Sequence, residues 1–250
     1  MMKRQWFYSV FAAIGLLALT SGSAQAQVVQ VSRGGDSRHA IGFNFGGFFP
    51  RGEDSRDVDD TILADLDDLA IQVKDFRNVT FGGEYLFGIS DFLEAGVGVG
   101  YYQKTVNSVY ANFVNTNGSE IEQDLKLRMV PVTATIRFLP VGRSGPVQPY
   151  VGGGVAIINW RYSEIGDFVD FDNNNTVFSN RSNPFVADGT AVGPVLLGGV
   201  RFPIGDAMTF GGEVRWQKAT GDTGGIDAGF LGDKIDLGGA SAAFTIHFRF

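Results

Sequence analysis

The chain has 250 residues, a formal net charge of −7 from 27 acidic and 20 basic side chains, 35 glycines and 22 phenylalanines. An acidic chain with no basic stripe is a poor candidate for binding nucleic acid. The sequence contains no cysteine, which excludes disulfide frameworks, thiolate catalysis and cysteine metal sites.

The first 26 residues have the pattern of a signal peptide. Lys3 and Arg4 give a positive start, residues 6–19 are apolar, and residues 24–26 (AQA) form a small-residue cleavage site. The apolar run is shorter than the about 20 residues that a comfortable transmembrane helix needs. We predict a signal peptide over residues 1–26, with an uncleaved anchor as the alternative, and a short polar lead-in over residues 27–38.

From Ile41 onward, apolar and polar side chains alternate with the period of two that is typical of β-strands. Eight such runs cover residues 41–49, 76–87, 93–101, 121–138, 150–162, 191–202, 208–217 and 240–250. Long polar connections at 51–75, 103–120, 163–190 and 218–231 alternate with short turns at 88–91, 139–149 and 203–206. This alternation predicts an up-and-down arrangement in which the first and last strands begin and end on the same side.

Run length and loop length together predict the architecture. Most runs are close to the about 9–11 residues that a tilted membrane-spanning strand needs. Outer-membrane barrels have long outer loops, short periplasmic turns and both termini in the periplasm. We therefore predict an all-β fold, an eight-stranded antiparallel up-and-down transmembrane β-barrel over residues 39–250, located in the cell outer membrane. The alternative is a soluble lipocalin-like barrel or sandwich, whose apolar side chains would face inward.

Aromatic side chains collect at the ends of the runs, where membrane barrels carry aromatic girdles. The expected periplasmic girdle consists of Phe87, Phe92, Phe138, Tyr150, Phe202, Phe248 and Phe250. The expected outer girdle consists of Phe49, Tyr101, Trp160 and Trp216. On the fifth run the predicted outward residues are Tyr150, Ala156, Ile158, Trp160 and Tyr162, with Asn159 and Arg161 inward.

Two stretches leave alternatives open. On the fourth run, Lys126 and Arg128 fall in the outward register, so either a bulge near Pro131 shifts the phase or both bases lie among lipid headgroups. The 51–75 connection is strongly acidic, and Val58, Ile62, Leu66 and Leu69 recur at helical spacing. We expect a short amphipathic helix there, able to rest on the barrel mouth, in a loop that is either solvated or a loose cation site.

The inward face of the predicted barrel collects charged residues of both signs. They are Glu84, Glu94 and Glu213 with Arg137, Arg201, Arg215 and Arg249. The interior of an eight-stranded barrel is only wide enough for side chains to fill it. Because isolated buried charges are costly, these groups need one another. We predict a plug of paired charges, with a lined ion path as the alternative.

Three segments carry a resemblance to a known family. The closing residues 244–250 (FTIHFRF) place Phe244, Ile246, Phe248 and Phe250 on the outward face, and they resemble the terminal signal by which the barrel-assembly machinery recognises its substrates. Residues 131–138 (PVTATIRF) and 148–154 (QPYVGGG) resemble the bacterial outer-membrane β-barrel domain family. This resemblance covers nearly all of residues 39–250 and implies a small barrel similar to the OmpA transmembrane domain or OmpW.

The expected role is non-enzymatic. His39 and His247 are the only histidines, and two imidazoles alone make a weak metal site. No phosphate loop or dinucleotide fingerprint is present, so we expect no cofactor. We predict a monomeric outer-membrane protein with an envelope-structural or surface-binding role, contacting outer-membrane lipid and lipopolysaccharide. The alternative is a passive carrier or narrow channel for small hydrophobic molecules.

Overall fold

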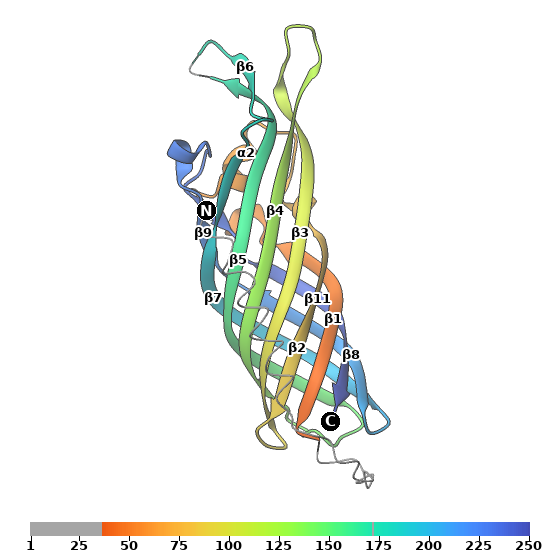
Figure 1. Cartoon of the computed structure of the whole chain (residues 1–250). Coiled ribbons are helices and arrows are strands. Elements are labelled where there is room, and N and C mark those ends of the chain that lie inside the picture. The colour runs from red at the N-terminus through yellow and green to blue at the C-terminus, as the bar shows by residue number, and fades with distance from the viewer. Residues whose placement is uncertain (1–36, 172) are drawn as a thin grey trace, which may run out of the picture. The chain divides into compact units, whose positions relative to one another are not determined.

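The computed structural model describes residues 37–171 and 173–250, so the predicted signal peptide and nearly all of the lead-in lie outside the described residues. Eight long strands form a closed antiparallel barrel (Figure 1). They are β1 (His39–Pro50), β2 (Asn78–Gly88), β3 (Leu93–Val114), β4 (Glu120–Phe138), β5 (Gln148–Asp170), β7 (Phe185–Ile204), β8 (Met208–Gln217) and β11 (Gly239–Arg249). The predicted fold class is confirmed.

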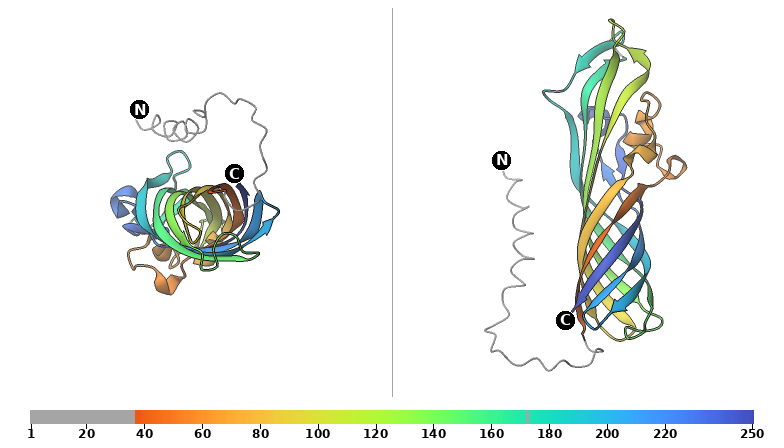
Figure 2. Two further views of the ribbon diagram at one scale, coloured as in Figure 1. Left: turned by 90° about the horizontal axis from the view of Figure 1, so that it is seen from below. Right: turned by 90° about the vertical axis from the view of Figure 1, so that its right-hand side faces the viewer.

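The barrel closes between its first and last strands. β1 pairs with β11 over Ala40–Pro50, with Phe43 opposite Ile246, and β4 pairs with β5 to complete the ring. The view along the axis shows the ring of strands (Figure 2, left). Both ends of the described chain lie at the end that carries the short turns, where the Phe250 amide donates to the His39 carbonyl at 3.0 Å. By the loop-length rule this is the periplasmic end.

Apolar side chains cover the outside of the barrel wall. Phe43, Phe45, Val97, Val214 and Phe244 are 57%, 60%, 57%, 59% and 80% exposed. A soluble barrel would place these side chains inside and polar residues outside, which is the reverse of what is observed. Among the described residues, no helix is long and apolar enough to cross a membrane.

Four strands are about twice as long as the others, and three of them, β3, β5 and β7, are much longer than predicted. β3, β4, β5 and β7 contain 22, 19, 23 and 20 residues, against 10 to 12 in the other four barrel strands. The predicted loops 103–120 and 163–190 are therefore mostly strand, and the short β6 (Thr176–Ser179) pairs with the end of β5. These segments are polar, so their alternation of inward and outward side chains is weak in the sequence. In the structure Val106 and Ser108 face inward and are buried. These strands project beyond the rest of the barrel (Figure 1).

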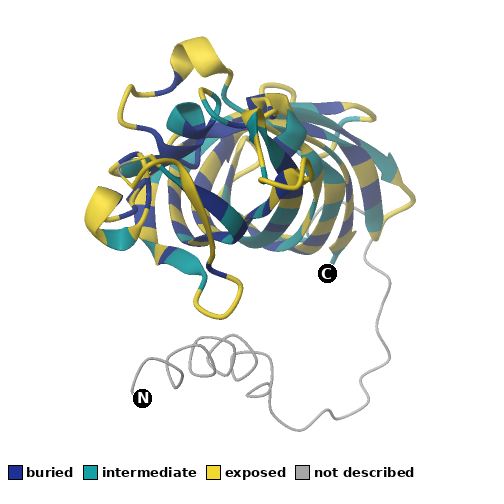
Figure 3. Cartoon of the chain, turned by 90° about the horizontal axis from the view of Figure 1, so that it is seen from above, coloured by how far each residue is buried: buried dark blue, intermediate teal, exposed yellow. Residues whose placement is uncertain are grey.

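Two connections cover the outer mouth, as the view from above shows (Figure 3). The β1–β2 connection contains η1 (Glu53–Ser55), α2 (Thr61–Asp65) and η2 (Val73–Phe76). The β8–β11 connection contains β9 (Thr220–Asp222), η3 (Gly225–Ala228) and β10 (Lys234–Asp236). The expected helix exists but has five residues, capped by the Asp60 side chain, and Val58 is 85% exposed outside it. We call residues 51–77 and 218–238 together the lid.

The predicted orientation of β5 is wrong. The residues expected outward, Tyr150, Ala156, Ile158, Trp160 and Tyr162, face inward and are at most 1% exposed. Asn159 and Arg161 face outward, in the same parity as the exposed Val155 and Ile157. Both faces of this strand are apolar, because the upper interior of the barrel is filled by a hydrophobic core. Trp160 and Tyr150 therefore do not belong to the outer and periplasmic girdles.

The ambiguity on β4 is resolved by its register. β4 pairs with β5 without interruption from Gln123 to Phe138, so no bulge shifts the phase near Pro131. Buried inward residues alternate with outward ones along the whole strand, and Lys126 and Arg128 face outward. The second reading, in which both bases lie above the apolar belt, fits this geometry.

Candidate functional site

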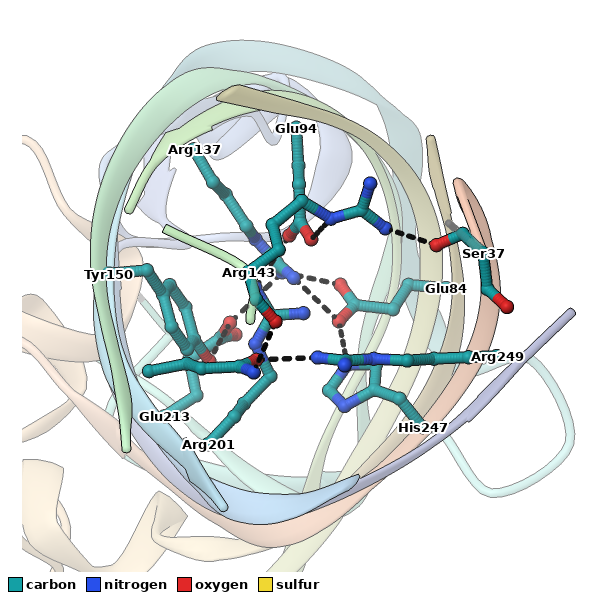
Figure 4. A network of polar contacts seen from close by, with 11 residues as sticks. Ser37, Glu84, Glu94, Arg137, Arg143, Tyr150, Arg201, Glu213, His247 and Arg249 are labelled. Atoms are coloured by element: carbon teal, nitrogen blue, oxygen red, sulfur yellow. Dashed lines mark hydrogen bonds and ion pairs between the residues drawn. The ribbon is translucent and has the colours of Figure 1, made fainter. Parts of the chain in front are cut away.

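The periplasmic half of the barrel interior contains a network of charged side chains (Figure 4). Its carboxylates come from β2, β3 and β8, and its guanidinium groups come from β4, the β4–β5 turn, β7, β8 and β11. Strand alternation brings those on strands together, because each of them lies between two outward residues, and the β4–β5 turn adds Arg143. We call this set the charge plug. Its members are Glu84, Glu94, Glu213, Arg137, Arg143, Arg201, Arg215, Arg249, Tyr150, Gln148 and His247.

Arg137 lies at the centre of the plug and is fully buried. Its two terminal nitrogens donate to the Glu84 carboxylate at 3.0 and 2.6 Å, in a bidentate pair, and one of them also reaches Glu213 at 3.0 Å. On the other side of Glu84, His247 Nε2 lies 2.8 Å from Oε1. Arg215 contacts Glu213 at 2.7 Å and is 18% exposed. A bidentate pair of this kind fixes both distance and orientation.

A second cluster surrounds Glu94. This carboxylate accepts from Arg201 at 2.5 Å and from Arg143 Nε at 3.1 Å, and Arg201 is 1% exposed. The Tyr150 ring lies between the two clusters, with the guanidinium carbons of Arg137 and Arg201 5.1 and 4.8 Å from its centroid. The Tyr150 hydroxyl donates to Glu213 at 3.0 Å. This ring shields two like charges from each other through cation–π contacts.

The structure brings six of the seven predicted interior charges into ion pairs. The exception is Arg249, which donates to the Gln148 side-chain carbonyl and not to any of the three predicted glutamates. The prediction missed Arg143, Gln148, Tyr150 and His247. His247 could have been found from the sequence, since it alternates with the outward Ile246 and Phe248. Tyr150 could not, because its strand is apolar on both faces.

Glycine makes room for His247. A Cβ built on Gly42, directly across the β1–β11 ladder, would lie 2.4 Å from the His247 ring and 3.1 Å from Glu84 Cγ. Any side chain at this position would displace one of the two. The space that glycine leaves is therefore used to bury an imidazole beside a carboxylate.

The plug side chains occupy the periplasmic half of the barrel interior. Above it lies a cavity of about 60 Å³, lined in part by Asn44, Thr80, Tyr102 and Arg215. Such a volume holds a few water molecules. The plug contains five guanidinium groups and three carboxylates, so its formal charge is net positive even with His247 neutral. The plug thus separates the periplasmic end from a small polar chamber.

A hydrophobic core closes the other side of this chamber. The barrel wall contributes the buried residues Phe48, Tyr102, Val106, Leu125, Leu127, Met129, Ala156, Ile158, Trp160, Tyr162, Ala187, Ala191 and Val195. The lid contributes Ile62, Leu69, Ile71, Val73, Phe76, Ala219, Phe230, Ile235 and Leu237. The expectation that an apolar side of the 51–75 connection rests on the mouth is therefore met by Ile62 and Leu69. The expectation of a solvated loop is wrong for this part of it.

Buried polar groups fasten the two halves of the lid to each other. Asp60 accepts from Arg56 at 2.6 Å and from the Asp236 amide at 2.5 Å, and Arg51 donates to the Asp236 carboxylate at 2.7 Å. The Thr61 hydroxyl donates to the Gly232 carbonyl at 2.7 Å. These contacts join segments more than 160 residues apart in the sequence. The lid is therefore a single packed unit made from two connections.

One lid carboxyl is attached to the barrel wall. The Tyr162 hydroxyl donates to Asp65 Oδ2 at 3.0 Å, and Asp65 is 4% exposed. The pKa of Asp65 is raised to about 7, mainly by burial and in addition by the neighbouring carboxylates of Asp60 and Asp68, while the hydrogen bond from Tyr162 opposes this rise. Burial also raises the pKa of Asp60, against the charge of Arg56. Near neutral pH, Asp65 is therefore protonated in some molecules and ionised in others.

The two histidines do not form a metal site together. His39 stacks on the ring of Phe250 and contacts the tilted ring of Phe87, whereas His247 faces the interior, so the two imidazoles lie on opposite faces of the wall. Within residues 37–171 and 173–250, no group of three or more metal-ligating side chains is present. The loose cation site considered for the acidic 51–75 connection therefore has no cluster of ligands to support it.

Comparisons with known proteins were made for sequence and for fold. No family model and no curated protein sequence matches the chain. Among solved structures, the outer membrane protein OprG from Pseudomonas aeruginosa is similar over 87% of this chain and 98% of its own, at 13% identity and a TM-score of 0.50. The N-terminal β-barrel domain of Pseudomonas aeruginosa OprF has 11% identity and a TM-score of 0.42, over 86% of this chain and 98% of its own. Ail, the attachment invasion locus protein of Yersinia pestis, has 12% identity and a TM-score of 0.42, over 88% and 100%.

Fold and surface point to the same class of protein. The likeness to OprG shows a shared fold. Independently, the wall is apolar outside and charged inside, as a barrel surrounded by lipid requires. Transmembrane barrels of this kind belong to outer membranes. The chain has the fold of the small eight-stranded outer-membrane β-barrels, and its apolar belt places it in the outer membrane.

Proposed function

We propose that this protein is a closed, non-enzymatic outer-membrane barrel with an envelope-structural or surface-binding role. The observation that carries the proposal is that buried side chains fill the interior at two levels, in the charge plug and in the lid core. A channel or carrier would have to move both. The buried pairs of the plug would lose their partners in such a movement, which is strongly unfavourable.

The projecting strands support the surface-binding part of this role. About 10 residues of β3 and of β5 extend past the length that a bilayer requires, which at about 3.3 Å per residue is roughly 30 Å of sheet. At their tips Tyr110, Phe113 and Phe171 pack together, with ring centroids 5.3 to 6.4 Å apart. The tips also expose Val114 and Phe178, which are 62% and 43% exposed. A rigid sheet with apolar side chains at its end is suited to binding a partner outside the cell.

Electrical recording tests the closed interior. The purified barrel in planar bilayers is expected to give no reproducible conductance steps and no flux of a hydrophobic dye. A variant in which residues 53–75 are replaced by a short Gly-Ser linker should also stay closed, because the charge plug remains. The same deletion combined with Glu84→Ser and Arg137→Ser is expected to conduct and serves as the matched positive control. Steps or dye flux in the unmodified protein would favour the passive carrier.

The terminal strand is the second part of the proposal. We propose that the outward face of β11, with Phe244, Ile246, Phe248 and Phe250, is read by the barrel-assembly machinery. These four side chains are 45% to 80% exposed, so the folded barrel buries little of them. Before the barrel closes, when β11 has not yet paired with β1, the assembly machinery could contact these regularly spaced side chains on one face of the strand. Contact with lipid accounts for their exposure, and their place on the terminal strand is what supports a role in recognition.

A further inference from the structure

An unpaired basic cluster lies on the outside of the wall, just above the apolar belt. It consists of Lys126 and Arg128 on β4 and Arg161 on β5, which line a groove of about 330 Å³ together with Gln103, Ser163 and Ile165. Lys126 and Arg161 are exposed, and Arg128 is half-buried. The interior charge plug is on the opposite face of the same strands, so this groove is a separate site.

The register places like charges directly opposite one another. Arg128 is the cross-strand partner of Arg161, and Lys126 is the partner of Ser163. Side chains at such positions are about 5 Å apart at Cβ, and like charges there repel. Inside the barrel the same strand is arranged differently, since Arg137 lies opposite Glu94. The Arg128–Arg161 juxtaposition is unfavourable by itself, and an anion between the two guanidinium groups would relieve it.

No carboxylate of the described chain satisfies these bases. None of the three forms an ion pair within 4.0 Å in the described residues. The nearest acids by register are Asp124, whose carboxylate accepts from Asn107 at 2.6 Å, and Asp188, the partner of Arg161 on β7. In addition, the Arg128 Nε is buried and has no hydrogen-bond partner among the described groups.

The height of the cluster on the wall identifies the kind of anion. Along β4 the outward side chains are apolar at Ile136 and Val132, and four residues beyond Val132 the outward side chain is Arg128. Along β5 the outward side chains change in the same way from Ile157 to Arg161. Tyr101, an aromatic residue of the outer girdle, donates to the neighbouring Gln103 at 3.0 Å. The groove therefore begins where acyl chains end and headgroups start.

We propose that Lys126, Arg128 and Arg161 form a binding site for a phosphate group of an outer-leaflet lipid. Two guanidinium groups match the oxygens of a phosphate in bidentate geometry, and a lysine adds a point charge. The acyl chains of the same molecule would lie on the apolar wall below, against Val132 and Ile157. A free phosphate would use the same three bases without this lower contact. The site does not depend on whether the barrel interior is closed.

Lipid titration followed by native mass spectrometry tests the site. The probes are bisphosphorylated lipid A, the same lipid with its phosphates removed, and inorganic phosphate, each added to the purified barrel in neutral detergent. Unmodified protein should bind the phosphorylated lipid about 100-fold more tightly than the dephosphorylated one, at roughly a factor of five per base. Replacing Lys126, Arg128 and Arg161 together with Gln should abolish this preference.

A second triple variant provides the matched control. Replacing the exposed Lys74, Arg77 and Lys218 with Gln changes the net charge equally and should leave the lipid preference intact. Gel mobility of unboiled samples confirms that each variant is a folded barrel. Equal binding of both lipids by the unmodified protein, or an equal loss in both triple variants, overturns the proposal. Inorganic phosphate binding as tightly as lipid A, and lost only in the groove variant, would keep the anion site and overturn its assignment to lipid.

Discussion

At the scale of single residues, the barrel interior depends on pairing. Arg201 is 1% exposed, and Glu94 is the carboxylate with which it forms an ion pair. Neither group can be solvated from the chamber or from the lipid side. Removing one member of such a pair leaves the other charged and buried, which costs more than the pair itself contributed.

We expect Glu94→Gln to lower the free energy of unfolding by about 3–5 kcal/mol, because it leaves the Arg201 guanidinium without an anion. Denaturant unfolding in detergent, followed by the mobility of unboiled samples, measures this change. Asp167→Asn is the matched control, since it makes the same chemical change in a pair with Arg181 whose side chains are 30% and 55% exposed. That substitution should cost about 0–1 kcal/mol. Equal effects of the two variants would contradict a plug held by its charge pairs.

At the scale of elements, the lid is the part of the molecule whose stability depends on pH. Asp65 is held against Tyr162 in the closed lid, with Asp60 and Asp68 on its own connection and Glu164 two residues beyond Tyr162 on β5. The pKa of Asp65 is about 7 in the closed lid, above its ordinary value of 3.8. A carboxyl group with a raised pKa binds its proton more tightly in the closed lid than in an open one. Closure is therefore favoured most below about pH 4, weakens as the pH rises toward 7, and then levels off.

Hydrogen exchange of the α2 amides should report this dependence. The protection factor of residues 61–66 is expected to fall by up to about tenfold per pH unit between about pH 5 and 7, since one proton is released on opening. Asp65→Asn removes one titrating group and should make the profile less steep while keeping the lid closed at pH 8; Asp60 and Glu164, whose pKa values are also raised by burial, account for the slope that remains. Asp54→Asn, an exposed acid of the same connection, should leave the profile unchanged. A profile that is the same with Asp65→Asn and without it would exclude Asp65 as the source.

At the scale of the whole molecule, closure joins the two ends of the barrel domain. β1 and β11 pair along their full length. Phe250 adds one backbone hydrogen bond to His39 and a ring stacked on the His39 imidazole, with 5.9 Å between the two ring centroids. Phe250 is 61% exposed, so its removal should cost well under the roughly 1.5–3 kcal/mol of a fully buried side chain. Any large effect of its removal would have to arise during assembly.

Deletion of Phe250 is expected to reduce the amount of folded barrel in the outer membrane to a minor fraction, because the assembly machinery would lose its recognition residue. The measurement is the heat-modifiable band in outer-membrane fractions. Phe210→Ala, which removes a lipid-facing ring of similar exposure (47%) from the neighbouring β8, should leave the amount nearly unchanged. Normal levels of the deleted protein, or equal losses in both, would count against a recognition role.

Much of this protein could be predicted from its sequence because a membrane barrel has a strict local rule. A strand between lipid and a polar interior must alternate, so β1, β2, β8 and β11 show their faces directly. The same rule predicted seven interior charges, and six of them form ion pairs. Loop lengths then indicated which end of the barrel faces the periplasm.

The tertiary structure decided what the local rule does not reach. On β5 both faces are apolar, and only the packing of the lid against Trp160 and Tyr162 determines which face points inward. The continuation of β3 to Val114 depends on pairing with β4, since polar strands are stabilised by their partners and not by their composition. The lid itself joins segments more than 160 residues apart, and no local pattern could show that Asp60 contacts Asp236. The sequence by itself determined the barrel, whereas the three-dimensional contacts determined how side chains and the lid fill its interior.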